Sequence, residues 1–132
     1  MKNLISKELA IKLKEIGFNE PCIAEFRGED IQPVSQMSVD FSYSTNSEIS
    51  TETHYWLSAP TYEEVKMWFL EKHSILITVR RGDTFLKEYF SEVEAEGWIW
   101  ESRFESDYYE AFVNGINEAI HHLKTFNGLQ KT

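Results

Sequence analysis

The chain has 132 residues, a length that fits one domain, residues 1–132, and with 42% hydrophobic and 14% aromatic residues it is too hydrophobic for a disordered protein of this charge. Its 22 acidic residues outnumber its 13 basic ones, so the formal net charge is −9, and we expect no direct binding to nucleic acid or to an anionic membrane surface. No stretch approaches the roughly 18 apolar residues of a membrane span, and the N-terminus lacks the apolar run of a signal peptide. We therefore expect a cytoplasmic protein.

The first predicted element is a helix over residues 6–16. Ser6 is suited to the N-cap, because its hydroxyl can accept a hydrogen bond from a free amide of the first turn. Gly17 is suited to the position just after the helix, where a left-handed backbone is common. Leu9 and Leu13 fall on one face of the helix and should be buried.

Two short strands are predicted next. Residues 22–26 form a short apolar run, and the turn sequence RGED follows at residues 27–30. A weaker strand is predicted over residues 31–34. Since Pro33 has no amide hydrogen to donate to a neighbouring strand, this second strand should lie at the edge of a sheet.

Residues 35–53 are rich in serine and threonine and carry few hydrophobic side chains. The spaced hydrophobic residues alternate, which is compatible with a two-faced strand; they are Met37, Val39, Phe41 and Tyr43. The segment can be an ordered edge hairpin or a mobile binding loop. Because serine-rich connections are ordinary in globular proteins, we favour the hairpin.

The second predicted helix is the most clearly bounded element. A short strand over residues 54–57 is stopped by Pro60, and the spacing of Thr61 and Glu64 is that of a capping box, in which each side chain bonds to the other residue's amide. The helix should end near His73, which can cap its last carbonyls or orient a substrate. Its buried stripe is predicted to comprise Val65, Trp68 and Phe69.

A hairpin and a further strand are predicted to follow. Ile75, Ile77 and Val79 alternate, which indicates a strand, and residues 81–83 form a turn that leads into a returning strand over residues 84–90. Residues 91–97 are predicted to be an acidic connection, and residues 98–102 another strand. A last helix starts near Asp107, where Gly115 in its interior costs about 1 kcal/mol relative to alanine; a close approach of helix to sheet would explain that glycine.

These elements predict an α+β fold with a mainly antiparallel sheet and two or three helices packed on one face. The order is roughly α-β-β, a loop or further strands, then α-β-β-β-α.

Three segments resemble a group of small uncharacterised proteins that are frequent in Bacteroides-type bacteria and in phages or other mobile elements. The segments are AIKLKEIGFNEPC (10–22), APTYEEVKMWFLEKHSILITV (59–79) and YYEAFVNGINEAIHHL (108–123). The resemblance implies a compact intracellular domain that is often associated with mobile elements. It implies no activity and no catalytic residues.

The search for catalytic, cofactor and metal sites gives no candidate. Cys22, the single cysteine, is expected to be a small buried residue and not a nucleophile. Glu118 and His121 have a spacing seen in di-iron helices, but one such pair supplies too few ligands, and with His122 they fit a solvated helix end better. Phosphate-binding glycine loops and nucleophile elbows are missing. We therefore expect no metal and no cofactor.

The strongest candidate for function is an acid-aromatic segment, residues 88–110, in which eight acidic residues are interleaved with seven aromatic ones and Arg103 is the only basic residue. Aromatic side chains in the core and acids in water would explain it, but tryptophan and tyrosine are also favoured at interfaces. The candidate partner-binding residues are Trp98, Trp100, Glu101, Tyr108 and Tyr109.

Strand alternation puts Trp98 and Trp100 on one face of the sheet and Ile99 with Glu101 on the other. Either pair can face the helices. We favour the tryptophans, because the open face of an antiparallel sheet is usually mixed and polar. Homodimerisation through the open sheet face is the main exception that we consider.

The expected function is that of a non-enzymatic accessory or interaction protein that binds a protein partner, as a monomer or a homodimer. The alternative is an acidic nucleic-acid mimic that presents carboxylates in place of phosphates to a DNA-binding protein. A small hydrolase comes third.

Overall fold

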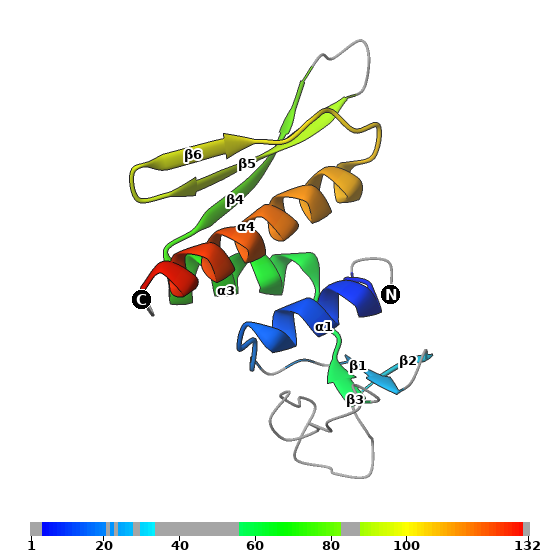
Figure 1. The fold of residues 1–132 in the computed structure, drawn as a ribbon. Helices are drawn as coiled ribbons and strands as arrows, with labels where there is room; N and C mark the ends of the chain where they lie inside the picture. Colours follow the sequence, from blue (N-terminus) through cyan, green and yellow to red (C-terminus); the bar gives the residue numbers. More distant parts are fainter. Residues whose placement is uncertain are drawn as a thin grey trace. The chain divides into compact units, whose positions relative to one another are not determined.

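The computed structural model describes residues 4–20, 22, 24–27, 30–33, 56–82 and 88–130. The chain forms two compact units, residues 1–65 and 66–132. Within the described residues, the order of elements is α1-β1-β2-β3-α3-β4-β5-β6-α4 (Figure 1). The fold is α+β, as predicted, and the predicted order of helices and strands is roughly matched.

In the first unit, helix α1 (Lys7–Glu15) has the predicted boundaries. The Ser6 hydroxyl accepts a hydrogen bond from the Leu9 amide at 3.2 Å, as expected of an N-cap. At the other end, Gly17 has a φ of 96°, and the amide of Phe18 donates to the carbonyl of Leu13 at 2.9 Å. This is a Schellman ending, which only a residue at ease in the left-handed region completes without strain.

The first unit also contains a small antiparallel sheet. It comprises β1 (Ala24–Arg27), β2 (Asp30–Pro33) and β3 (Trp56–Ser58) in the order β2-β1-β3. Pro33 therefore lies in an edge strand, as predicted. The segment 35–53, with its alternative predictions of hairpin or loop, lies outside the described residues.

Helix α3 (Tyr62–His73) spans the boundary between the units and starts with the predicted capping box. The Glu64 carboxylate accepts from the Thr61 amide at 2.9 Å, and the Thr61 hydroxyl accepts from the Glu64 amide at 3.1 Å. All three side chains of the predicted stripe are buried: Val65, Trp68 and Phe69.

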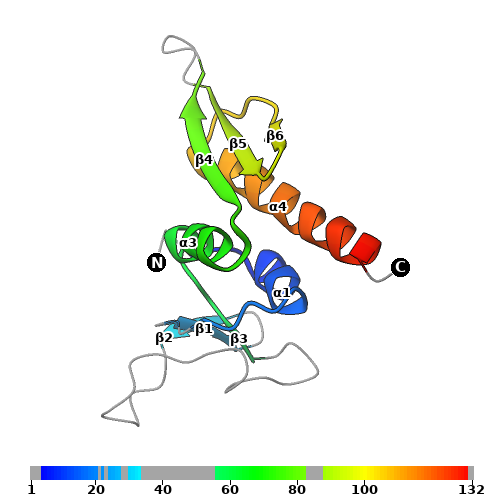
Figure 2. The ribbon, with the colours of Figure 1, turned by 90° about the vertical axis from the view of Figure 1, so that its left-hand side faces the viewer.

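The second unit contains an antiparallel sheet of β4 (Leu76–Arg81), β5 (Tyr89–Ala95) and β6 (Trp98–Glu101), in that order (Figure 2). The predicted acidic connection over residues 91–97 is wrong for most of its length, because residues 91–95 are strand and only the turn at Glu96 and Gly97 connects β5 to β6. Ser91, Val93 and Ala95 alternate with Glu92 and Glu94, so the segment is a two-faced strand with small inner residues.

Helix α4 (Tyr108–Gln130) runs across one face of this second sheet and contacts β4 and β5 (Figure 1). The Asp107 carboxylate accepts from the Tyr109 amide at 3.3 Å and so caps the helix. A Cβ atom on Gly115 would lie 2.9 Å from both the Ile77 Cγ2 and the Ser91 Cβ. The close approach of helix to sheet that the glycine suggested is therefore present.

Candidate functional site

The two faces of the β4-β5-β6 sheet have different chemistry. On the α4 face, Val93 is fully buried and pairs with Trp100, while Trp98 stacks on His122 of α4 with ring centroids 4.7 Å apart. Ile99 and Glu101 lie on the opposite face and are exposed. The tryptophans thus face the helix, which is the orientation that we favoured.

Of the five predicted partner-binding residues, Tyr108 and Tyr109 lie together at the start of α4. Their rings meet edge to face at 5.3 Å, and Tyr108 also meets Tyr89 of β5 at 5.9 Å. The two tryptophans lie on the same side of the sheet as α4, whereas Glu101 lies on the other side. The five residues therefore do not form one surface.

The side of the sheet away from α4, called the open face below, is acidic with apolar side chains between the acids. Glu92 pairs across the strands with Glu101, and Glu94 pairs with Ile99, which is 67% exposed. Arg80 on β4 donates to the Glu92 carboxylate at 3.1 Å. Phe90 lies on the same face, in edge contact with the exposed ring of Phe104.

Crowding of the carboxylates affects their protonation. The pKa of Glu94 is raised, chiefly because its protonated carboxyl hydrogen-bonds to Glu92, with smaller contributions from desolvation and from the negative charge of Glu92. Arg80 opposes this shift. On the open face, Glu94 therefore holds its proton more tightly than an isolated glutamic acid does.

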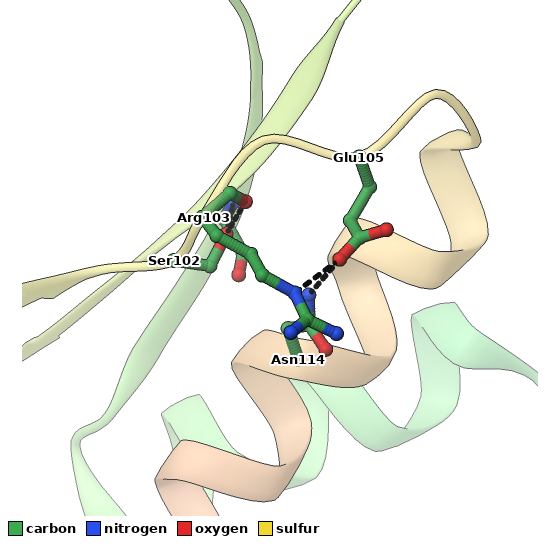
Figure 3. Close-up of polar contacts among 5 residues, drawn as sticks. Ser102, Arg103, Glu105 and Asn114 are labelled. Carbon is green, nitrogen blue, oxygen red and sulfur yellow. Dashed lines mark hydrogen bonds and ion pairs between the residues drawn. The ribbon is translucent and has the colours of Figure 1, made fainter.

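A polar cluster that sequence reasoning missed lies between the end of β6 and α4. One oxygen of Glu105 accepts from the Arg103 Nε at 2.7 Å and from the Asn114 amide at 3.1 Å (Figure 3). Both bonds lower the pKa of Glu105, with that to Arg103 the larger cause. The Ser102 hydroxyl donates to the Arg103 carbonyl at 2.8 Å. Hydrogen bonds therefore hold residues 102–105 at both ends of this segment.

This cluster borders a groove of about 390 Å³, here called the β6–α4 groove. Its lining residues are Trp100, Ser102, Arg103, Asn114, Asn117 and Glu118. The helix contributes three polar side chains at positions i, i+3 and i+4, which share one helix face. That polar stripe beside the apolar one was the signal in the sequence that could have indicated the groove.

A second cavity of about 740 Å³ lies at the junction of α3 and β4, and His73 and His122 are among its lining residues. The His73 ring packs edge-on against Trp68 with centroids 4.7 Å apart. Burial lowers the pKa of His73, because the charged form loses solvation there. Contact with the aromatic residues of α3 thus favours the neutral form of the ring.

The remaining candidates can be located as well. Cys22 is buried, with its thiol 3.4 Å from the Glu20 carbonyl, which agrees with a small core residue. Glu118 lines the β6–α4 groove, whereas His121 is exposed and His122 stacks on Trp98. In the part of the chain that the structure describes, no three potential ligands gather in a way that could hold a metal ion. Nor does any helix of that part have the length and apolar character to cross a membrane.

Comparison with known proteins gives no further guide to function: the chain matches no protein-family model, no curated protein and no solved structure. The resemblance to small proteins of Bacteroides-type bacteria and mobile elements accordingly stays a prediction.

Proposed function

We propose that the protein is a non-enzymatic binding protein and that the open face of its β4-β5-β6 sheet docks a basic protein partner. The observation that carries this proposal is the exposure of Ile99, at 67%, in the middle of an acidic strand pair. An exposed isoleucine flanked by charged residues is the pattern of an interface anchor within a polar rim.

The charge of the open face determines which partner fits. Glu92, Glu94 and Glu101 are balanced on this face by Arg80 alone among the residues described. Two copies of the chain packed through this face would bring the three carboxylates against their counterparts, which like-charge repulsion disfavours. A partner with lysine or arginine around an apolar pocket would instead be attracted and oriented.

The apolar residues supply the affinity that exposed charge pairs cannot. Surface ion pairs contribute about 0–1 kcal/mol each, whereas full burial of an isoleucine contributes roughly 1.5–3 kcal/mol. Phe90 and Phe104 extend the apolar area at the end of β5. We therefore expect Ile99 to dominate the affinity and the carboxylates to set the association rate and its salt dependence.

The test is affinity capture with the full chain as bait, followed by titration calorimetry on the purified captured protein. Wild type should capture a basic protein, and Ile99→Thr, which keeps a β-branched residue in the strand, should bind it at least about tenfold more weakly. Glu71→Gln, which removes an exposed acid on α3, outside the open face, is the control substitution and should bind like wild type.

Equal binding by Ile99→Thr and wild type would contradict the proposal, as would an acidic partner. Competition with duplex DNA distinguishes the alternative function. If DNA displaces the protein from its partner, the crowded carboxylates occupy a phosphate-binding surface and the protein is a nucleic-acid mimic. If DNA has no effect, the partner binds the open face through a surface that does not bind DNA.

A further inference from the structure

The β6–α4 groove has a chemistry that the open face lacks. One wall is the half-buried indole of Trp100, and the others are formed by polar side chains from the segment after β6 and from α4. Its volume of about 390 Å³ lies near the lower end of the range for small-molecule sites, roughly 300–1,000 Å³. The groove is therefore suited to a ligand with one or two rings.

The polar side chains of the groove are of one geometric type. Arg103, Asn114, Asn117 and Glu118 each end in a planar group with two or more hydrogen-bonding atoms side by side. Such groups bind best to ligands that offer pairs of neighbouring donors and acceptors. Neighbouring hydroxyl groups on a sugar ring are pairs of this kind.

Two of these side chains are held in position before any ligand arrives. The shared oxygen of Glu105 anchors the Nε of Arg103 and the amide nitrogen of Asn114 (Figure 3). The terminal nitrogens of Arg103 and the carbonyl oxygen of Asn114 have no partner among the described residues, and neither has the carboxylate of Glu118. Donors and acceptors thus remain available on both sides of the groove.

The charges in the groove disfavour an anionic ligand. The Arg103 guanidinium is already matched by Glu105 at 2.7 Å, which leaves the Glu118 carboxylate as the unmatched charge in a protein of net charge −9. An anion would be repelled by that field.

From this arrangement we infer that the β6–α4 groove binds a neutral pyranose sugar, with the apolar face of the ring against Trp100 and its hydroxyl groups bonded to Arg103, Asn114 and Glu118. The amphipathic faces of a pyranose match this pairing of an indole with planar polar groups. The site lies on the opposite side of the sheet from the open face, so it is independent of partner docking.

The test uses saturation-transfer NMR and titration calorimetry on the full chain, with methyl glucopyranoside, methyl galactopyranoside, methyl mannopyranoside and N-acetylglucosamine as probes. For a ligand of this size we expect a Kd on the order of 1 mM for at least one probe. Saturation should transfer most strongly to the ring C–H protons that lie against the indole.

Two variants and two matched controls locate the binding. Glu118→Ala and Trp100→Phe should each weaken binding at least about tenfold, and the first keeps a good helix former in α4 and so preserves the fold. His121→Ala, one turn further along the same helix and exposed, should leave the Kd unchanged. Trp98→Phe, on the same strand and sheet face but stacked on His122, should also leave it unchanged.

Three results would overturn the assignment. The first is no binding of any pyranoside at about twenty times the expected Kd of ~1 mM. The second is binding that Glu118→Ala leaves intact. The third is tighter binding of a cationic probe, arginine amide, or an anionic one, inorganic phosphate, with loss in the same variants, since either would show that the groove selects charge.

Discussion

Gly115 and Ser91 face each other where α4 packs against the second sheet. A Cβ atom on the glycine would lie 2.9 Å from the Cβ of the serine and 2.9 Å from the Ile77 Cγ2, both of which belong to buried side chains. Contacts of that length cannot be accommodated without moving backbone. The position of α4 on the sheet, and with it the β6–α4 groove, depends on the missing side chain.

Gly115→Ala should therefore lower the free energy of unfolding by about 1–3 kcal/mol, as overpacked cores do, although alanine alone would add about 1 kcal/mol to helix stability. Denaturant unfolding monitored by circular dichroism measures the change. His121→Ala, exposed on the same helix, should be neutral or slightly stabilising. A stabilised Gly115→Ala variant would show that the helix can move away from the sheet at little cost.

Ser91 itself has an unusual environment, because its hydroxyl is completely buried and has no hydrogen-bond partner among the described residues. An unsatisfied buried hydroxyl costs about 1–3 kcal/mol, so Ser91→Ala should raise the free energy of unfolding by about 1 kcal/mol. The comparison is Ser102→Ala: the Ser102 hydroxyl accepts from the Ser91 amide at 2.8 Å, so its removal should destabilise the protein by about 1 kcal/mol. Equal effects of the two substitutions would mean that the Ser91 hydroxyl has found a partner in solution.

Ser74 is the residue just after α3 and has a φ of 55°, in the left-handed region that suits glycine. Its amide donates to the Leu70 carbonyl at 3.1 Å and so closes the helix. Ser74→Gly should stabilise the protein by up to about 1 kcal/mol in urea unfolding, reduced by the greater flexibility of glycine in the unfolded chain. The reverse change at the end of α1, Gly17→Ser at a φ of 96°, should destabilise by a similar amount. If Ser74→Gly lowered stability, the hydroxyl of Ser74 would have a role that outweighs the backbone strain.

Local signals in the sequence predicted the elements whose ends are determined by neighbouring residues. The capping box of Thr61 and Glu64 and the glycine after α1 gave the helix boundaries correctly, because each rests on hydrogen bonds within one turn. The alternation around Trp98 likewise predicted which side chains share a face. Periodicity does not say which strand is the neighbour, so the division of strands into two sheets could not be predicted.

The acidic strand and the groove were missed for a related reason. The acidic composition of residues 91–97 predicts a connection, and the alternation that marks a strand is weak because one inner position holds a small polar residue, Ser91, which packs against Gly115. The side chains of the β6–α4 groove come from residues 100–103 and 114–118. Only tertiary packing brings these two segments together.

The carboxylate pair on the open face gives a prediction about pH. The pKa of Glu94 is raised in the folded protein, first by its hydrogen bond to Glu92, then by desolvation and by the charge of Glu92, against the opposing charge of Arg80. The folded state therefore holds a proton more tightly than the unfolded state, so this group favours folding at low pH, and the benefit is lost as pH rises through the raised pKa. Glu101, which pairs with Glu92 across the strands, adds to the negative charge on this face.

Glu94→Gln should consequently have a higher melting temperature than wild type at pH 7, and the difference should vanish below the ordinary pKa of 4.5, where the wild-type carboxyl is protonated. Scanning calorimetry from pH 4 to pH 8 at low ionic strength measures the difference in melting temperature at both ends of this range. Salt should shrink the difference at pH 7, because Glu94 lies at the protein surface, where charge repulsion is screened over roughly 10 Å at 0.1 M. Glu96→Gln, in the turn after β5, serves as control and should show a smaller effect. A difference between Glu94→Gln and wild type that stays constant across the pH range would mean that the two carboxylates do not share a proton, and that the open face carries its full negative charge at all these pH values.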